Sequence, residues 1–184
     1  MAEKKALREA MLARLMAQDP SERTRRSRLI EERLWRLPAF QKAELVLFFV
    51  SMPQEVDTHG MIDRAIAEGK RVAVPLSDLK ARKLTFYEIR ERSRDLKTGL
   101  YGIAEPDVSK LKPVEASSAG CVIVPGVLFD GQKRRIGHGA GFYDRFLGNE
   151  AKNLAKIAGC YSFQVVDRVP QETHDVAMDE ILAG

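Results

Sequence analysis

The chain has 184 residues, of which 45% are hydrophobic and 30% charged, and a formal net charge of +4. This length suits one globular domain with a continuous core. The longest purely apolar run, residues 45–50, is much shorter than the ~20 residues of a membrane helix. The first residues are charged and lack the apolar centre of a secretory signal. We therefore expect a cytoplasmic protein without a membrane segment.

The positive charge lies in the N-terminal part of the chain. Residues 1–36 hold ten Lys and Arg against six Asp and Glu, whereas the remainder holds twenty of each. A basic helical arm could bind nucleic acid, but acidic residues interrupt it and no aromatic residues are interleaved for stacking on bases. A small anion, such as a nucleotide, fits the same charge, so nucleic acid is the less favoured partner.

Two helices are predicted at the N-terminus. Residues 3–18 place an apolar stripe on one face, formed by Leu7, Met11 and Leu15. A second helix begins with Asp19 as N-cap, Pro20 at the first position and Glu22 at the third, a capping-box arrangement. It is predicted to reach about residue 35 and to end before Pro38.

A strand, a helix and a second strand follow. Residues 45–50 form a continuous apolar run, which is typical of a strand covered on both faces. Thr58 is predicted to cap the next helix and Gly69 to end it. Arg71–Val74 reads as the second strand, and this spacing predicts that the two strands are parallel.

Further strands are expected at 84–89, near the sheet periphery, at 121–124, in its centre, and at 156–161 and 178–183. Residues 90–119 read as a long charged loop punctuated by Gly and Pro, and long ordered loops are often functional. The predicted fold class is α/β, with residues 1–184 forming one domain around a mostly parallel sheet flanked by helices.

Residues 124–147 are the most informative stretch. They contain glycines at Gly131, Gly137, Gly139 and Gly141 and basic side chains at Lys133, Arg134 and Arg135, and the carboxylate of Asp144 follows near the start of a short predicted helix, 142–147. Glycines let backbone N–H groups approach an anion, and arginines neutralise it. A tight hairpin or a bulge needs the same glycines, and spacing alone favours that interpretation at least equally.

The cysteines and histidines do not suggest a metal site. Cys121 and Cys160 each lie in an apolar run, which favours buried thiols over a disulfide. The histidines, His59, His138 and His174, are scattered without the spacing of zinc ligands.

The Gly-rich stretch resembles a known signature. Its residues are Pro125-Gly126, Phe129-Asp130 and Arg135-Ile136-Gly137-x-Gly139-x-Gly141-Phe142-Tyr143-Asp144. This pattern is similar to that of the 5-formyltetrahydrofolate cyclo-ligases, also called 5,10-methenyltetrahydrofolate synthetases. That family usually has Tyr where this chain has Phe142, and often Arg or Lys where it has His138.

The resemblance extends over essentially the whole chain. Segments in the same order as in the family are Lys4-x-x-Leu7-Arg8, Ser51-Met52-x-x-Glu55-Val56-Asp57-Thr58, Ile103-x-Glu105-Pro106 and His174-Asp175-x-x-x-Asp179. It implies a fold similar to the sugar-phosphate isomerase and CoA-transferase group. It also implies conversion of 5-formyltetrahydrofolate to 5,10-methenyltetrahydrofolate, driven by ATP with Mg²⁺ and releasing ADP and phosphate.

The resemblance also implies roles for individual residues. ATP would be bound by Lys4, Arg8, Arg134, Arg135, Ile136, Gly137, His138, Gly139, Ala140, Gly141, Phe142 and Tyr143. Mg²⁺ would be held by Asp144 and Asp175, and the reduced folate by Val50, Met52, Glu55, Tyr101 and Phe142. Arg135 and Tyr143 are the candidate catalytic residues. The substrate could be polyglutamylated, and we expect a monomer.

Several alternatives stay open at the level of sequence. Glu55 could be a charge in the first turn of a helix, Tyr101 could belong to the core, and Asp179 competes with Asp175 for the metal. The departures at His138 and Phe142 also permit a paralogue that keeps the nucleotide site but uses another substrate. We further expect that Asp144→Asn leaves the unliganded melting temperature unchanged or raised, because an isolated carboxylate at a phosphate site tends to repel its surroundings.

Overall fold

The computed structural model describes residues 2–99 and 102–184. The helices are α1 (Ala2–Met16), α2 (Pro20–Arg36), α3 (Pro38–Lys42), α4 (His59–Ala67), α5 (Arg92–Asp95) and α6 (Phe142–Gly148), with short 3-10 turns η2 (Ala116–Ser118) and η3 (Ser162–Gln164). The strands are β1 (Leu45–Leu47), β2 (Arg71–Asp78), β3 (Lys83–Ile89), β4 (Leu96–Thr98), β5 (Ala104–Pro106), β6 (Cys121–Ile123), β7 (Leu128–Asp130), β8 (Arg135–Ile136), β9 (Ala155–Cys160), β10 (Val165–Val166) and β11 (Glu180–Ala183).

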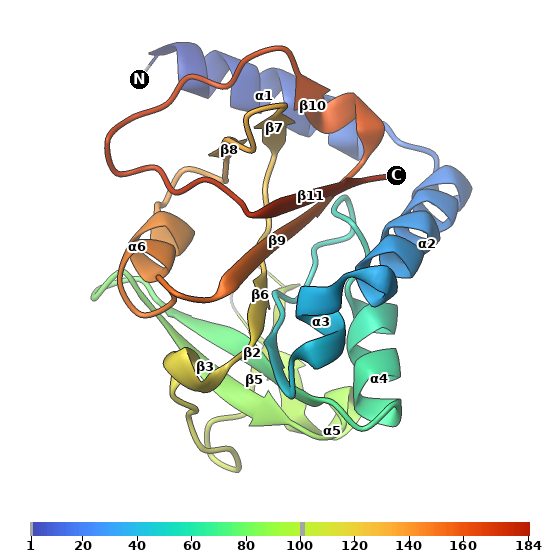
Figure 1. Cartoon of the computed structure of the whole chain (residues 1–184), viewed down its shortest axis with the longest axis vertical. Coiled ribbons are helices and arrows are strands. Elements are labelled where there is room, and N and C mark those ends of the chain that lie inside the picture. Colours follow the sequence, from blue (N-terminus) through green and yellow to red (C-terminus); the bar gives the residue numbers. More distant parts are fainter. Residues whose placement is uncertain (1, 100–101) are drawn as a thin grey trace.

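The central sheet has the strand order β11-β9-β6-β1-β2-β3 (Figure 1). All neighbouring pairs from β11 to β2 are parallel, and β3 runs antiparallel to β2 at the edge. The mostly parallel sheet, the pairing of β1 with β2, the central place of β6 and the peripheral place of β3 confirm the sequence-based predictions. The likeness to the sugar-phosphate isomerase and CoA-transferase group stays a prediction.

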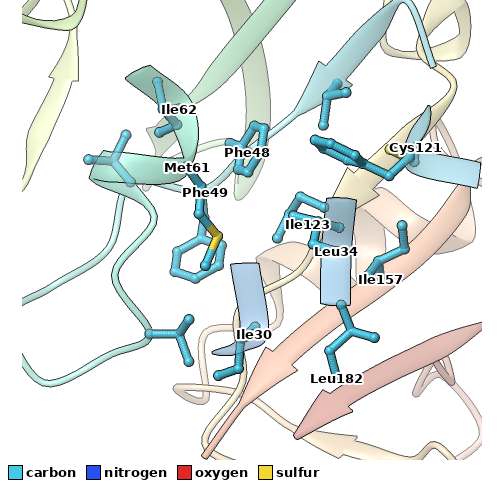
Figure 2. Packing of buried hydrophobic residues seen from close by; sticks show 14 of the residues in the cluster. Ile30, Leu34, Phe48, Phe49, Met61, Ile62, Cys121, Ile123, Ile157 and Leu182 are labelled. Atoms are coloured by element: carbon cyan, nitrogen blue, oxygen red, sulfur yellow. The ribbon is translucent and has the colours of Figure 1, made fainter. Parts of the chain in front are cut away.

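The core lies on both faces of this sheet. One cluster packs β-strand side chains against α2 and α4, and Figure 2 shows Ile30 and Leu34 from α2 facing Ile123, Ile157 and Leu182 from the strands. A second cluster on the other face includes Leu45, Leu47 and Phe146. Alternate residues of β1 therefore enter opposite clusters, which is why its sequence is apolar throughout.

The start of α2 follows the predicted capping. The Asp19 carboxylate accepts hydrogen bonds from the backbone N–H groups of Ser21 and Glu22, at 2.9 and 3.2 Å. The Glu22 side chain pairs with Arg25, also at 2.9 Å, so the reciprocal half of a capping box is not formed among these contacts. Pro38 follows the end of α2 and is also the first residue of the short helix α3, a position that suits proline.

The start of α4 differs from the prediction. Thr58 precedes the helix, but its side chain makes no capping hydrogen bond there. Its hydroxyl instead donates to Phe49 O at 2.8 Å, and it accepts from Ser51 N at 3.0 Å. Thr58 thus fixes the loop before α4. The end of α4 is as predicted, with Gly69 in a left-handed conformation at φ +86°.

The Gly-rich stretch is divided between two structures. Its first part forms the β7–β8 hairpin, in a small sheet of order β10-β7-β8, and its turn contains Gly131 and Lys133 at φ +61°. The hairpin interpretation is therefore correct for this part. Only residues 137–141, between β8 and α6, form an irregular glycine loop. Residues 90–119 were predicted as a loop, but they contain α5, the paired strands β4 and β5, and η2.

Both cysteines are buried and free, as predicted. Burial raises the pKa of the Cys121 and Cys160 thiols to about 12, so they are protonated and unreactive near neutral pH. In the part of the chain that the structure describes, no helix is both long and apolar enough to cross a membrane.

Candidate functional site

The glycine loop, residues 137–141, is held at both ends by arginines. Arg8, from α1, donates its Nε–H to Gly137 O at 2.8 Å, and Arg145, from α6, donates to Ala140 O at 2.7 Å. A Cβ atom on Gly139 would lie 3.3 Å from the Arg8 guanidinium carbon, and the glycine has φ +106°. A glycine is needed there because a side chain at this φ would be strained, and it also leaves room for the Arg8 guanidinium next to the loop.

Lys4 lies one helical turn before Arg8 and forms an ion pair with Asp175. Its Nζ donates to Asp175 Oδ2 at 2.5 Å and lies 3.4 Å from Glu172 Oε2. Figure 1 shows how this occurs, because the segment between β10 and β11 runs past α1 on its way back to the sheet. Two predicted site residues, 171 positions apart in the chain, are thereby in direct contact.

The Asp175 carboxyl is held in its charged form. Burial by itself would raise its pKa, but hydrogen bonds from Lys4 and from Glu172 N–H, with the charges of Lys4 and His174, outweigh burial and lower the pKa. Oxygen and nitrogen atoms of Glu172, His174 and Asp175 all lie within 4.8 Å of one another. Glu172 was not singled out in the sequence, and His174 was noted there as a scattered histidine and as part of the closing segment, although an acid-x-His-Asp spacing is a signal for such a cluster.

Asp144 pairs with Arg135. The guanidinium donates from Nη2 to Asp144 Oδ1 at 2.7 Å and from Nη1 to Pro125 O at 3.3 Å, and the Arg135 side chain is only 3% exposed. Val176 N, next to Asp175 in the chain, also donates to Asp144 Oδ1, at 3.4 Å. The two predicted metal ligands thus lie on adjoining segments, each neutralised by a cation.

The competing carboxylate, Asp179, has a different position. It accepts from Lys156 N at 2.7 Å and so ties the start of β11 to β9. Arg134 is likewise engaged elsewhere, because its Nε donates to the buried Asp130 at 2.6 Å within the β7–β8 hairpin. Ile136 is buried in β8.

Glu55 lies in the loop between β1 and α4, so its interpretation as a first-turn helix residue is wrong. It is 8% exposed, and its Oε2 accepts from Met52 N at 2.8 Å. Its other oxygen, Oε1, accepts from Nε2 of His138 at 2.8 Å. The contact between His138 and Glu55, which the sequence did not predict, connects the glycine loop to the loop that follows β1.

Glu55 and His138 also line a small pocket. Its other lining residues are Leu15, Phe49, Val56, Gly126, Gly159 and Gln164. Val50 is buried and Met52 half-buried on the same loop as Glu55, and Phe142 is half-buried at the start of α6. Tyr101 lies outside the described residues.

Tyr143 carries a hydroxyl that is buried without a hydrogen-bond partner among the described residues. Burial raises the pKa of this hydroxyl, the negative charge of Glu55 raises it further, and Arg135 lowers it. The Tyr143 hydroxyl is therefore a neutral donor, within the electrostatic reach of Glu55 and Arg135. Such an unsatisfied buried group is costly unless a ligand supplies the partner.

Comparison with known proteins gives the family of this arrangement. The sequence model described as the 5-formyltetrahydrofolate cyclo-ligase family matches residues 1–184. The chain belongs to this family. The resemblance seen in the sequence is thus confirmed over the full length.

Individual cyclo-ligases agree with the family match. The chain is 31% identical over 206 aligned residues to the 5-formyltetrahydrofolate cyclo-ligase of Saccharomyces cerevisiae, which covers 100% of this chain and 96% of the relative. It is 30% identical over 159 residues to a probable 5-formyltetrahydrofolate cyclo-ligase of Schizosaccharomyces pombe, with coverages of 79% and 78%. An NMR structure of the Aquifex aeolicus 5,10-methenyltetrahydrofolate synthetase matches with a TM-score of 0.84 at 28% identity, covering 98% of this chain and 89% of that one.

Proposed function

We propose that this chain, as one domain over residues 1–184, uses ATP to convert 5-formyltetrahydrofolate to 5,10-methenyltetrahydrofolate, with release of ADP and of phosphate that carries the formyl oxygen. The observation that carries the proposal is the 2.8 Å contact between His138 and Glu55. It joins the glycine loop, whose backbone can approach phosphates, to a buried carboxylate, which can accept the paired N–H donors of a pterin. A phosphoryl donor and a folate would therefore meet at this point.

The chemistry requires such a meeting. A formamide oxygen is a poor leaving group, so the formyl oxygen first attacks the γ-phosphorus of ATP, and ADP leaves. N10 of the folate then attacks the formyl carbon and loses its proton, the C–O bond breaks, and phosphate departs. The protein mainly positions the reactants and neutralises their charge, as in other phosphoryl transfers.

On the ATP side, Lys4, Arg8 and Arg135 supply positive charge around the loop 137–141. Arg8 already contacts the loop backbone, and Lys4, one helical turn before it, is half-buried against Asp175. Arginine suits this position because its planar fork matches phosphate oxygens. Arg134 also lies in the ATP set, although its contact with Asp130 leaves it less free to turn toward a ligand.

Asp144 and Asp175 would hold Mg²⁺, with Glu172 as a third carboxylate in reach of Asp175. Oxygen donors are the ligands that Mg²⁺ prefers, so these residues fit the ion. When bound, Mg²⁺ would offset the charge of the ATP phosphates. Because Arg135 and Lys4 now neutralise the two aspartates, ligand binding must exchange these ion pairs for new ones.

On the folate side, Glu55 would accept from the pterin, and Val50, Met52, Phe142 and Tyr101 would form the wall. The Tyr143 hydroxyl, buried without a partner, can donate to an oxygen of the substrate, and Arg135 lies close enough to stabilise charge there. These two residues are the proposed catalytic pair. We place the reaction in the cytoplasm and assign it to a monomer.

Following the absorbance of the methenyl product tests the proposal. Purified protein with 5-formyltetrahydrofolate, Mg²⁺ and ATP should produce it, with release of one ADP for each product formed, and omission of ATP should stop formation. Nucleotide turnover without methenyl product would favour a paralogue with another substrate. If the protein forms no methenyl product and also turns over no nucleotide, the enzymatic proposal is refuted.

A further inference from the structure

Two arginines from different helices converge on one aromatic ring outside the pocket. The guanidinium carbon of Arg14, near the end of α1, lies 4.6 Å from the centroid of the Phe163 ring. That of Arg26, in α2, lies 5.7 Å from the same centroid. Phe163, in η3, is half-buried and so supports both cations on an apolar base.

This pair of arginines carries unbalanced positive charge. Arg14 is exposed, and among the described residues no carboxylate forms an ion pair with it. Arg26 lies 3.3 Å from Glu22, but Glu22 is shared with Arg25. Among the described residues, Glu22 thus pairs with two guanidinium groups, those of Arg25 and Arg26, and none is left for Arg14, whose donors are available to a ligand.

The arginine pair borders the pocket that contains Glu55. Leu15 and Gln164, the chain neighbours of Arg14 and Phe163, both line that pocket. The Phe163 ring also stacks on Tyr161, at 5.7 Å between centroids, and the Tyr161 hydroxyl donates to Glu55 O at 2.8 Å. A ligand that starts at Glu55 and leaves the pocket on the Leu15 side would meet Arg14 and Arg26.

We propose that Arg14, Arg26 and Phe163 form a subsite for the carboxylates of the glutamate tail of the folate. The inference rests on the proposed function, since it assigns the far end of the same substrate. A guanidinium binds a carboxylate through two parallel hydrogen bonds and is weakly hydrated, so it suits a flexible anionic chain. Substrates with several γ-linked glutamates should use the subsite most.

The experiment compares tail lengths. KM is measured for 5-formyltetrahydrofolate with one, three and five glutamates, for the unaltered protein, Arg14→Gln and Arg26→Gln. Arg28→Gln is the matched control. Arg28 is exposed on α2, and its substitution removes the same charge outside the proposed subsite. The unaltered protein and the control should show a KM that falls as the tail lengthens.

In Arg14→Gln and Arg26→Gln, KM for the longest tail should rise about two- to fivefold relative to the shortest, as expected for loss of one exposed ion pair. In the unaltered protein, added salt should likewise weaken the dependence of KM on tail length. An unchanged ratio in both variants would overturn the inference. So would an equal rise for all tail lengths with a lowered melting temperature, since the arginines would then only pack on Phe163.

Failure of the proposed function has a different signature, because the unaltered protein would form no methenyl product from any tail length. Calorimetric titration with unreactive folic acid bearing one or five glutamates then tests the subsite directly. Tighter binding of the long tail that is lost in Arg14→Gln supports the subsite, and equal binding of both ligands refutes it.

Discussion

Arg135 and Asp144 form an ion pair at the edge of the glycine loop, with 2.7 Å between Nη2 of the arginine and Oδ1 of the aspartate. The arginine side chain is 3% exposed and its Nε is buried without a partner among the described residues. Asp144 is thus not an isolated carboxylate. We expected from the sequence that removing its charge would leave the unliganded melting temperature unchanged or raised, and this expectation has lost its physical basis. Breaking a buried ion pair from one side leaves a buried charge unpaired.

We therefore predict that Asp144→Asn abolishes turnover and also destabilises the unliganded protein, by ~2–3 kcal/mol. The double variant Arg135→Met, Asp144→Leu should recover most of the stability, because it removes both charges, while staying inactive. Urea unfolding and product absorbance measure the two effects. Near-normal turnover of Asp144→Asn across a Mg²⁺ titration would remove Asp144 from the metal site.

Lys4 and Arg8 should act on ATP rather than on folate. Replacing both with alanine should raise KM for ATP at least tenfold, corresponding to ~1.4 kcal/mol or more, because two half-buried cations are lost, one on the glycine loop and one on Asp175. Folate affinity should change little. Lys5→Ala is the control, since Lys5 is on the same helix but 72% exposed, and its one ion pair within residues 2–99 and 102–184 is with Glu9. Equal losses for both ligands would make α1 a structural element.

Glu55→Gln should weaken folate binding by ~1–3 kcal/mol, because it exchanges an acceptor for a group that also donates toward the pterin. ATP affinity should be nearly unchanged. Calorimetry with each ligand separately distinguishes these effects. If folate affinity is the same in the variant, Glu55 does not anchor the pterin.

His138→Ala should tighten folate binding in the absence of ATP about two- to fivefold. His138 occupies Glu55 Oε1 in the unliganded chain, so the pterin donors must displace or share it, at a cost of roughly 0.5–1 kcal/mol. The effect must disappear in a Glu55→Gln background, which provides a double-mutant cycle. A weaker affinity of His138→Ala would instead make His138 a direct contact of the substrate.

The Lys4–Asp175 pair should contribute to stability in a defined pH range. The folded pKa of Asp175 lies below its ordinary value of 3.8, so the contribution is present above that value and is lost as the pH falls through the folded pKa. Asp175→Asn should therefore be less stable than the unaltered protein near neutral pH, with the difference narrowing from about pH 4 downward. Urea unfolding across this range measures it, and a constant difference would show that the charge of Asp175 does not matter.

The sequence by itself determined the elements that depend on local pattern. Apolar runs placed β1, β6 and β9, Gly69 ended α4, and Asp19 capped α2, because strand burial and helix termini are set by neighbouring residues. The glycine and arginine signature likewise gave the family before any coordinates. Local pattern failed where one pattern suits two structures. The glycines at Gly131 and Gly139 look alike in the sequence, although the first lies in a hairpin turn and the second in an irregular loop.

Only the tertiary structure decided which charges meet. Lys4 and Asp175 are brought together because the segment before β11 passes α1, and His138 reaches Glu55 because the glycine loop and the loop after β1 lie at the same pocket. Arg14 and Arg26 meet over Phe163 for the same reason. Such contacts depend on how the chain folds back on itself, and spacing along a sequence does not encode the partner of a charge that lies 83 or 171 residues away.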